Sequence, residues 1–147
     1  MQWPYLLFAV VAGAMIPFQA GINSQLSHWV GGPILAAFVS FVVGTIALFL
    51  VAAAQRRSVP SLGRIGDAPW WVWIGGLLGA FYVAGSIFAA PKLGAALLIA
   101  AVVAGQTAAS IVIDQYGWVG FKEQHISAGR LAGVLLVAAG VALVRVF

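Results

Sequence analysis

The sequence predicts an all-α integral membrane protein with five membrane-spanning helices. Hydrophobic residues make up 63% of its 147 residues, whereas charged residues make up only 7%. Its mean hydropathy is +1.08. About a quarter of the residues of a soluble domain are charged, so too few charges remain here to cover a surface that faces water. Five apolar stretches also reach the length of about 20 residues that crosses a bilayer as a helix.

The five stretches cover residues 3–27, 33–54, 70–91, 94–115 and 128–147, and they predict a single transmembrane domain over 1–147. Their apolar runs are uninterrupted, whereas the strands of a membrane barrel alternate between apolar and polar residues. We therefore expect helices. No basic segment precedes the first stretch, so we expect a retained span rather than a cleaved signal peptide.

The residues at the ends of the stretches predict where each helix begins. Pro33, after two glycines, is suited to the first turn of the second helix. Asp67 is the expected cap of the third helix, and Ser127 that of the fifth. The segment 91–94, with the sequence PKLG, predicts a tight turn between the third and fourth helices.

Charge predicts the orientation. The two longest polar segments, residues 55–69 and 116–127, follow the second and fourth helices and so share a side with the N-terminus. That side carries Arg56, Arg57, Arg64, Lys122 and Arg130, against Lys92 and Arg145 on the other. The positive-inside rule then favours a cytoplasmic N-terminus. The same side holds Trp3, Trp70, Trp71, Trp73 and Trp118, which predict an interfacial belt.

Small residues predict where helices pack closely. Gly75 and Gly79 form one GxxxG pair, and Gly129 and Gly133 form another. Such pairs let helix backbones approach each other in lipid. Tyr82 and Ser86 continue the helix face of the first pair. This face is either a packing seam or the lining of a cavity.

Amides and hydroxyls inside the apolar stretches predict a polar interior. An unpaired amide in hydrocarbon costs about 4–8 kcal/mol on an alkane scale, so these groups must face each other, water or a ligand. The candidate substrate-pathway residues are Gln19, Asn23, Gln106, Thr45, Tyr82 and Ser86. Hydrogen bonding between helices is the alternative role. Pro17 removes a backbone hydrogen bond and is expected to loosen the first helix. Asp114, at the end of the fourth stretch, is expected to cap its helix or pair with Lys122.

Four segments carry a resemblance to a known family. They are PFQAGINSQL, GGPILAAFVSFVVGTIAL, PWWVWIGGLLGAFYVAGSIFAAPKLGAALLIAAVVAGQ and GRLAGVLLVAAGVAL, in this order over essentially the whole chain. The sequence resembles the YdcZ-like family of small inner-membrane proteins in the drug/metabolite transporter superfamily. This resemblance implies a first-helix signature at Pro17, Gln19, Ala20, Gly21, Asn23 and Gln25, and a fourth-helix signature at Gly105 and Gln106.

The resemblance implies an inner-membrane exporter that assembles from antiparallel halves. Two inverted copies of five helices give ten, so the expected partner is a second copy or an oppositely oriented paralogue, besides the lipid bilayer and an unidentified solute. Small multidrug resistance transporters, which are distant kin by resemblance, carry a glutamate within the first helix. This chain has no Asp or Glu deep in any stretch, which favours a neutral or zwitterionic solute, or a weakly coupled uniporter, over proton-coupled export of cations.

Other functions find little support in the sequence. Catalytic motifs such as HExxH, GxSxG or a glycine-rich phosphate loop are lacking, so we expect neither an enzyme nor a cofactor. There are no cysteines, and His28 and His125 fall in segments expected on opposite sides, so no metal site is expected. No basic stripe with interleaved aromatics predicts nucleic-acid binding. A structural or regulatory membrane subunit and a channel remain the alternatives to a transporter.

Overall fold

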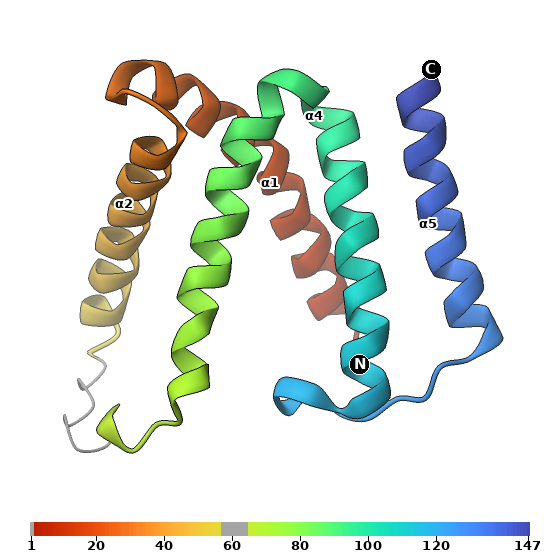
Figure 1. Cartoon of the computed structure of the whole chain (residues 1–147). Coiled ribbons are helices and arrows are strands. Elements are labelled where there is room, and N and C mark those ends of the chain that lie inside the picture. The colour runs from red at the N-terminus through yellow and green to blue at the C-terminus, as the bar shows by residue number, and fades with distance from the viewer. Residues whose placement is uncertain (1, 57–64) are drawn as a thin grey trace. The chain divides into compact units, whose positions relative to one another are not determined.

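The structure is a computed structural model that describes residues 2–56 and 65–147. Within these ranges, it contains helices and no strands. The α-helices are α1 (Trp3–Val30), α2 (Pro33–Ala54), α4 (Ile74–Tyr116) and α5 (Ala128–Val146), and 3₁₀ turns lie at Trp70–Trp73 and Trp118–Gly120 (Figure 1). In the described part of the chain, four helical segments are long and apolar enough to cross a membrane. The all-helical membrane fold is therefore supported.

The chain forms two compact units, Met1–Pro91 and Lys92–Phe147. The first contains α1, α2 and the first part of α4. The C-cap of α1 is Gly31, whose φ of 90° is a left-handed conformation that glycine adopts without strain. α2 begins two residues later at Pro33. This short connection packs α1 directly against α2.

α1 stays helical through Pro17 and ends three residues later than the expected boundary at residue 27. Its last turns contribute to the core of the first unit, together with the start of α2 and the first part of α4. The core residues are Ala36, Ala37 and Ile87, with Leu26, Val30, Val83 and Ala84 packed against them. Alanines at the centre of this core let the helices approach closely.

α4 is interrupted at Gly94, where φ is 71° and ψ is 167°. A straight helix of its 43 residues would extend about 65 Å, which is twice the thickness of the hydrocarbon core. The sequence predicted a tight turn at 91–94, but Pro91 lies within the helix and the backbone departs from helical geometry only at Gly94. This conformation is open essentially to glycine alone.

The predicted cap at Asp67 is wrong. The first turn at Trp70–Trp73 is a 3₁₀ helix whose N-cap is Pro69, and no side chain caps it. Pro69 has an extended backbone, with φ of −56° and ψ of 140°. A capping side chain accepts a hydrogen bond from a backbone N–H of the first turn, and it does so from the N-cap position. Asp67 lies two residues before that position.

The second unit contains the rest of α4, the segment 117–127 and α5. Ser127 caps α5 as predicted, because its Oγ accepts a hydrogen bond of 3.3 Å from the backbone N–H of Arg130. Of the basic residues that predicted the orientation, Arg57 and Arg64 lie outside the described residues.

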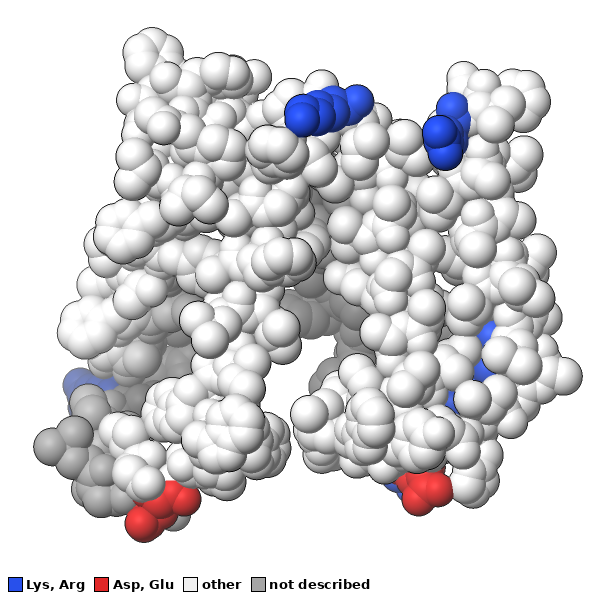
Figure 2. Space-filling model, in the orientation of Figure 1, with Lys and Arg blue, Asp and Glu red and all other residues white. Residues whose placement is uncertain are grey.

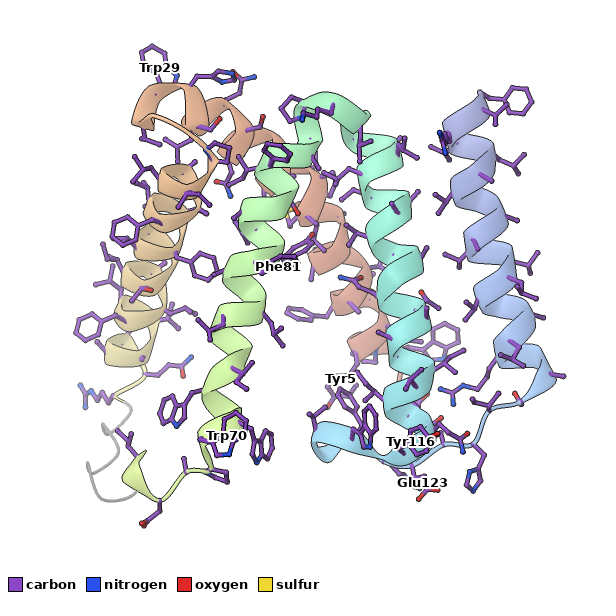
Figure 3. The ribbon with its side chains drawn as sticks, viewed as in Figure 1. Tyr5, Trp29, Trp70, Phe81, Tyr116 and Glu123 are labelled. Atoms are coloured by element: carbon purple, nitrogen blue, oxygen red, sulfur yellow. The ribbon has the colours of Figure 1, made fainter. Side chains whose placement is uncertain are left out.

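The surface is that of a protein surrounded by lipid. Charged side chains occupy few places on the face shown in Figure 2. Large apolar side chains such as Phe8, Phe81 and Leu136 are exposed. In the first unit, exposed aromatic side chains lie toward both ends, Trp29 at one and Tyr5 and Trp70 at the other (Figure 3). Such pairs of aromatic belts are typical of the two interfaces of a membrane.

Candidate functional site

The most unusual polar group in the first unit is the Asn23 side chain. Asn23 lies in α1 on a buried face that it shares with Ala20 and Ser24. It is only 5% exposed, and its Nδ2 atom has no hydrogen-bond partner among the described residues. A buried donor without a partner lowers the stability of the folded protein by about 1–3 kcal/mol. A bound molecule that supplies an acceptor would remove this cost.

Asn23 lines a small cavity between α1 and the first part of α4. The lining residues are Ile16, Gln19, Ala20, Asn23, Tyr82, Val83, Ser86 and Ile87. The cavity volume is about 10 Å³, which is near the lower limit for one water molecule. Four of the six predicted pathway residues therefore meet at one place, namely Gln19, Asn23, Tyr82 and Ser86.

Ser86 supplies the second buried polar group of this cavity. Its hydroxyl donates a 2.8 Å hydrogen bond to the backbone carbonyl of Tyr82, one turn earlier in α4. This bond uses the proton of the hydroxyl, but the oxygen can still accept. The cavity thus presents an unpaired N–H donor from Asn23 and an acceptor from Ser86.

A wider recess of about 230 Å³ adjoins the small cavity. It is lined by Gln19, Ser40, Phe41, Gly44, Thr45, Leu48 and Val83. Gln19 and Val83 line both spaces, so the two spaces lie next to each other. The recess brings Thr45 of α2 next to Gln19 of α1, as part of the same site.

Ser40 is a lining residue that the sequence analysis missed. It lies one turn before Gly44 on α2, so the two share a helix face that leads to Thr45. The same spacing rule that singled out the small and polar face of residues 75–86 would have found it.

An apolar groove of about 770 Å³ runs between α2 and the first part of α4. Its lining is Pro33, Ile34, Ala37, Phe38, Phe41, Ala80, Phe81, Ala84, Gly85 and Phe88. Phe81, one of these lining residues, projects from the first part of α4 (Figure 3). The groove carries no polar side chain among these residues, so it is suited to hydrocarbon rather than to a polar solute.

Gln106 and the predicted packing glycines do not line the three spaces described above. Gln106 belongs to the second unit, where its side chain is exposed and its carbonyl accepts a hydrogen bond from the Ser110 hydroxyl. A Cβ atom added to Gly79 would lie 3.6 Å from the Phe41 ring, which places this glycine against α2. The other predicted packing glycines, Gly75, Gly129 and Gly133, have no atom of the described residues within 4 Å of such a Cβ.

The second unit holds a polar cluster of a different kind. Asp114 forms an ion pair with Arg130, and their side chains are 18% and 30% exposed. Arg130 also donates a 3.0 Å hydrogen bond from Nη1 to the carbonyl of Gln124. The backbone N–H of Gln124 donates a 2.7 Å hydrogen bond to the backbone carbonyl of Asp114. These contacts fasten segment 117–127 to the end of α4 and the start of α5.

The predicted pairing of Asp114 with Lys122 is therefore wrong. Arg130 lies in the first turn of α5, and its planar guanidinium reaches the carboxylate and the Gln124 carbonyl together. A lysine ammonium lacks this forked geometry. Lys122 is exposed instead.

The histidines do not gather with other ligands. No group of three or more His, Cys, Asp or Glu side chains that could hold a metal lies in the described parts of the chain. His125 lies 3.6 Å from the Glu123 carboxylate and 3.4 Å from the Gln115 amide, whereas His28 lies in the last turn of α1.

Comparison with known proteins decides the family. The family described as "Putative inner membrane exporter, YdcZ" matches residues 4–143. The chain belongs to this family. It is also 28% identical over 140 residues to the inner membrane protein YdcZ of Escherichia coli (strain K12), a match that covers 95% of this chain and 93% of that protein. No solved structure matches it.

Family membership agrees with the helices described above. The chain is a multi-pass protein of the inner membrane and belongs to a class of membrane transporters. This class comprises exporters rather than enzymes. The resemblance stated from the sequence is thereby confirmed.

Proposed function

We propose that the chain exports a small solute across the inner membrane by alternating access, as one half of an antiparallel dimer. The observation that carries this proposal is the Asn23 side chain. A buried amide donor that has no partner in the described part of the chain, inside an apolar helix of an exporter-family protein, is suited to binding a solute rather than to joining helices.

Each subunit crosses the membrane five times in this proposal. The crossings are α1, α2, the parts of α4 before and after Gly94, and α5. α4 is too long for one crossing, and its break at Gly94 divides it into segments of about 20 residues each.

The odd number of crossings supports the antiparallel dimer. Two inverted copies give a ten-helix transporter with related halves, an arrangement that transporters often use. The glycines Gly75, Gly129, Gly133 and Gly140 have no described atom within 4 Å of an added Cβ, so another helix can approach them closely. We place α5 in the dimer interface, with a second copy or an oppositely oriented paralogue as the partner.

The proposed pathway residues of the first unit are Gln19, Asn23, Thr45, Tyr82 and Ser86. Gln106 is the proposed pathway residue of the second unit. Pro17 lies two residues before Gln19 and removes one hydrogen bond of α1, which weakens the helix beside the site. The end of α1 can then move relative to its beginning during transport.

Cross-linking tests the dimer. The chain has no cysteine, so introduced cysteines are unique. In an antiparallel dimer, a cysteine at Gly129 of one subunit is expected to link to a cysteine at Arg145 of the other. Links only between identical positions would show a parallel arrangement and would overturn the proposal.

Reporter fusions test the orientation. A cytoplasmic N-terminus and five crossings place Phe147 in the periplasm, so a fusion there is expected to report mainly periplasmic exposure. Equal populations in the two orientations would indicate dual topology and a homodimer. A cytoplasmic Phe147 in all molecules would contradict the proposed orientation.

A solute screen tests transport itself. Small metabolites that raise the melting temperature of the purified protein are then followed in proteoliposomes. Saturable, protein-dependent movement of a binding metabolite supports the transporter. A current that does not saturate would indicate a channel, and binding or flux of no metabolite would favour a structural or regulatory subunit.

A further inference from the structure

The chemistry of the site in the first unit selects a class of solute. None of the described residues that line the 10 Å³ cavity or the 230 Å³ recess carries a charge. Their polar groups are the amides of Gln19 and Asn23 and hydroxyls, among which Ser40 and Thr45 belong to the recess. A charged solute would leave water here without an opposite charge to compensate it.

We infer that this site binds a small uncharged solute whose carbonyl or hydroxyl oxygen accepts a hydrogen bond from Asn23 Nδ2. The inference rests on the proposed function and specifies its substrate. It excludes the zwitterionic solutes that the sequence alone left open.

Asn23 sets the requirement for an acceptor. Its Nδ2 atom is buried and unpaired among the described residues, so an incoming oxygen gains a hydrogen bond without displacing a protein partner. Ser86 lines the same cavity, and its hydroxyl oxygen can still accept a hydrogen bond. A hydroxyl or a primary amide, which both donates and accepts, matches this pair.

The sizes of the two spaces set the dimensions of the solute. The 10 Å³ cavity holds about one polar atom, and the recess of 230 Å³ is smaller than the about 300–1,000 Å³ of pockets for drug-sized ligands. Phe41, Leu48 and Val83 give the recess apolar walls. The solute therefore combines a polar end with a short apolar part.

Four isosteric probes separate charge from shape. Lactamide is neutral, lactate is an anion, alaninamide is a cation and alanine is a zwitterion, yet all have the same number of non-hydrogen atoms. Their binding to the purified dimer, and their protein-dependent movement in proteoliposomes, are compared at neutral pH. Lactamide is expected to be preferred over each of the others by at least about tenfold.

Variants of α1 tie this preference to Asn23. Asn23→Leu is expected to bind lactamide about 2- to 12-fold more weakly, the loss of one hydrogen bond. Gln25→Leu is the matched control, because Gln25 is an exposed amide of the same helix that lines neither space; its affinity should not change. Asn23→Asp, measured at the same neutral pH at which alaninamide is a cation, should shift the preference towards alaninamide.

Several results would overturn the inference. Preference for a charged or zwitterionic probe would show a different substrate class and leave the transporter proposal standing. An equal effect of Gln25→Leu and Asn23→Leu would show that Asn23 does not contact the solute specifically. If none of the four probes binds or moves, the inference fails, whereas a positive metabolite screen would still uphold transport.

Discussion

The two units of the chain differ in whether their polar side chains that are shielded from solvent have hydrogen-bond partners. In the second unit, Asp114 and Arg130 satisfy each other, and the backbone of Gln124 completes their network. In the first unit, Asn23 is more deeply buried than either of them, yet its amide nitrogen has no partner among the described residues. The charged groups of the second cluster hold a connection in place, while the uncharged amide of the first remains available.

This difference separates two uses of polar residues in a membrane protein. A closed network stabilises the fold, because breaking it leaves a group without a partner. An unpaired donor costs stability, and such a cost is typical of functional sites. Substitutions that affect stability and binding separately can therefore test whether the two clusters differ as described.

The largest effect on stability is expected at the closed network. Arg130→Leu leaves the Asp114 carboxylate without its partner and should lower the free energy of unfolding by about 1.5–3 kcal/mol. Denaturant titration in detergent measures this loss. Arg145→Leu, at the other end of α5, serves as the control and should have a smaller effect.

A double variant sharpens this result. Replacing Asp114 and Arg130 together removes both charges, so the combined loss should be smaller than the sum of the single losses. Strict additivity would show that the ion pair does not stabilise the unit, and the contrast between the two clusters would disappear.

The next effect concerns the start of α5. Ser127→Ala removes the acceptor of the Arg130 N–H and should cost about 1 kcal/mol, whereas Ser127→Asp should retain most of the stability. Melting temperatures of the two variants give the comparison. An equally large loss in both would mean that the side-chain cap does not contribute.

The open site should respond in the opposite sense. Asn23→Leu removes an unpaired donor, so the melting temperature should stay the same or rise, while solute binding weakens. If Asn23 instead joins helices, the substitution should cost about 0.6 kcal/mol and at most about 1.7 kcal/mol. Melting temperature and affinity, measured on the same preparation, distinguish these outcomes.

The smallest effect is expected at Ser86. Its hydroxyl bonds within its own helix, so Ser86→Ala should change stability by less than about 0.5 kcal/mol. Binding of lactamide should fall less than in Asn23→Leu, because an acceptor is lost but the unpaired donor remains. A larger loss of binding than in Asn23→Leu would make Ser86 the principal contact.

The sequence predicted best those features that depend on neighbouring residues. Apolar length and the sparsity of charge indicated membrane helices, and Ser127 predicted its own cap. Pro33 begins α2 because its fixed φ suits a first turn. Gln19 and Asn23 were singled out as amides inside an apolar stretch, and Tyr82 and Ser86 by their shared helix face; all four line one cavity.

Features that depend on contacts between distant segments were harder to predict. Lys122 is closer to Asp114 in the sequence than Arg130 is, but the path of segment 117–127 brings Arg130 to the carboxylate. Asp67 does not cap a helix, because the extended backbone of Pro69 delays the first turn to Trp70. Asn23 Nδ2 lacks a partner among the described residues because of which side chains of α1 and α4 line the cavity, and no local sequence pattern reveals this.

Gly94 has a consequence for biosynthesis. Between Trp70 and Tyr116 the chain carries only two charged residues, Lys92 and Asp114, so the membrane-insertion machinery meets almost no charged stop signal in this stretch. In the five-crossing arrangement proposed above, the backbone conformation of Gly94 divides this stretch into two crossings. The side of the membrane on which segment 117–127 lies then depends on Gly94. The side of the C-terminus depends on it as well.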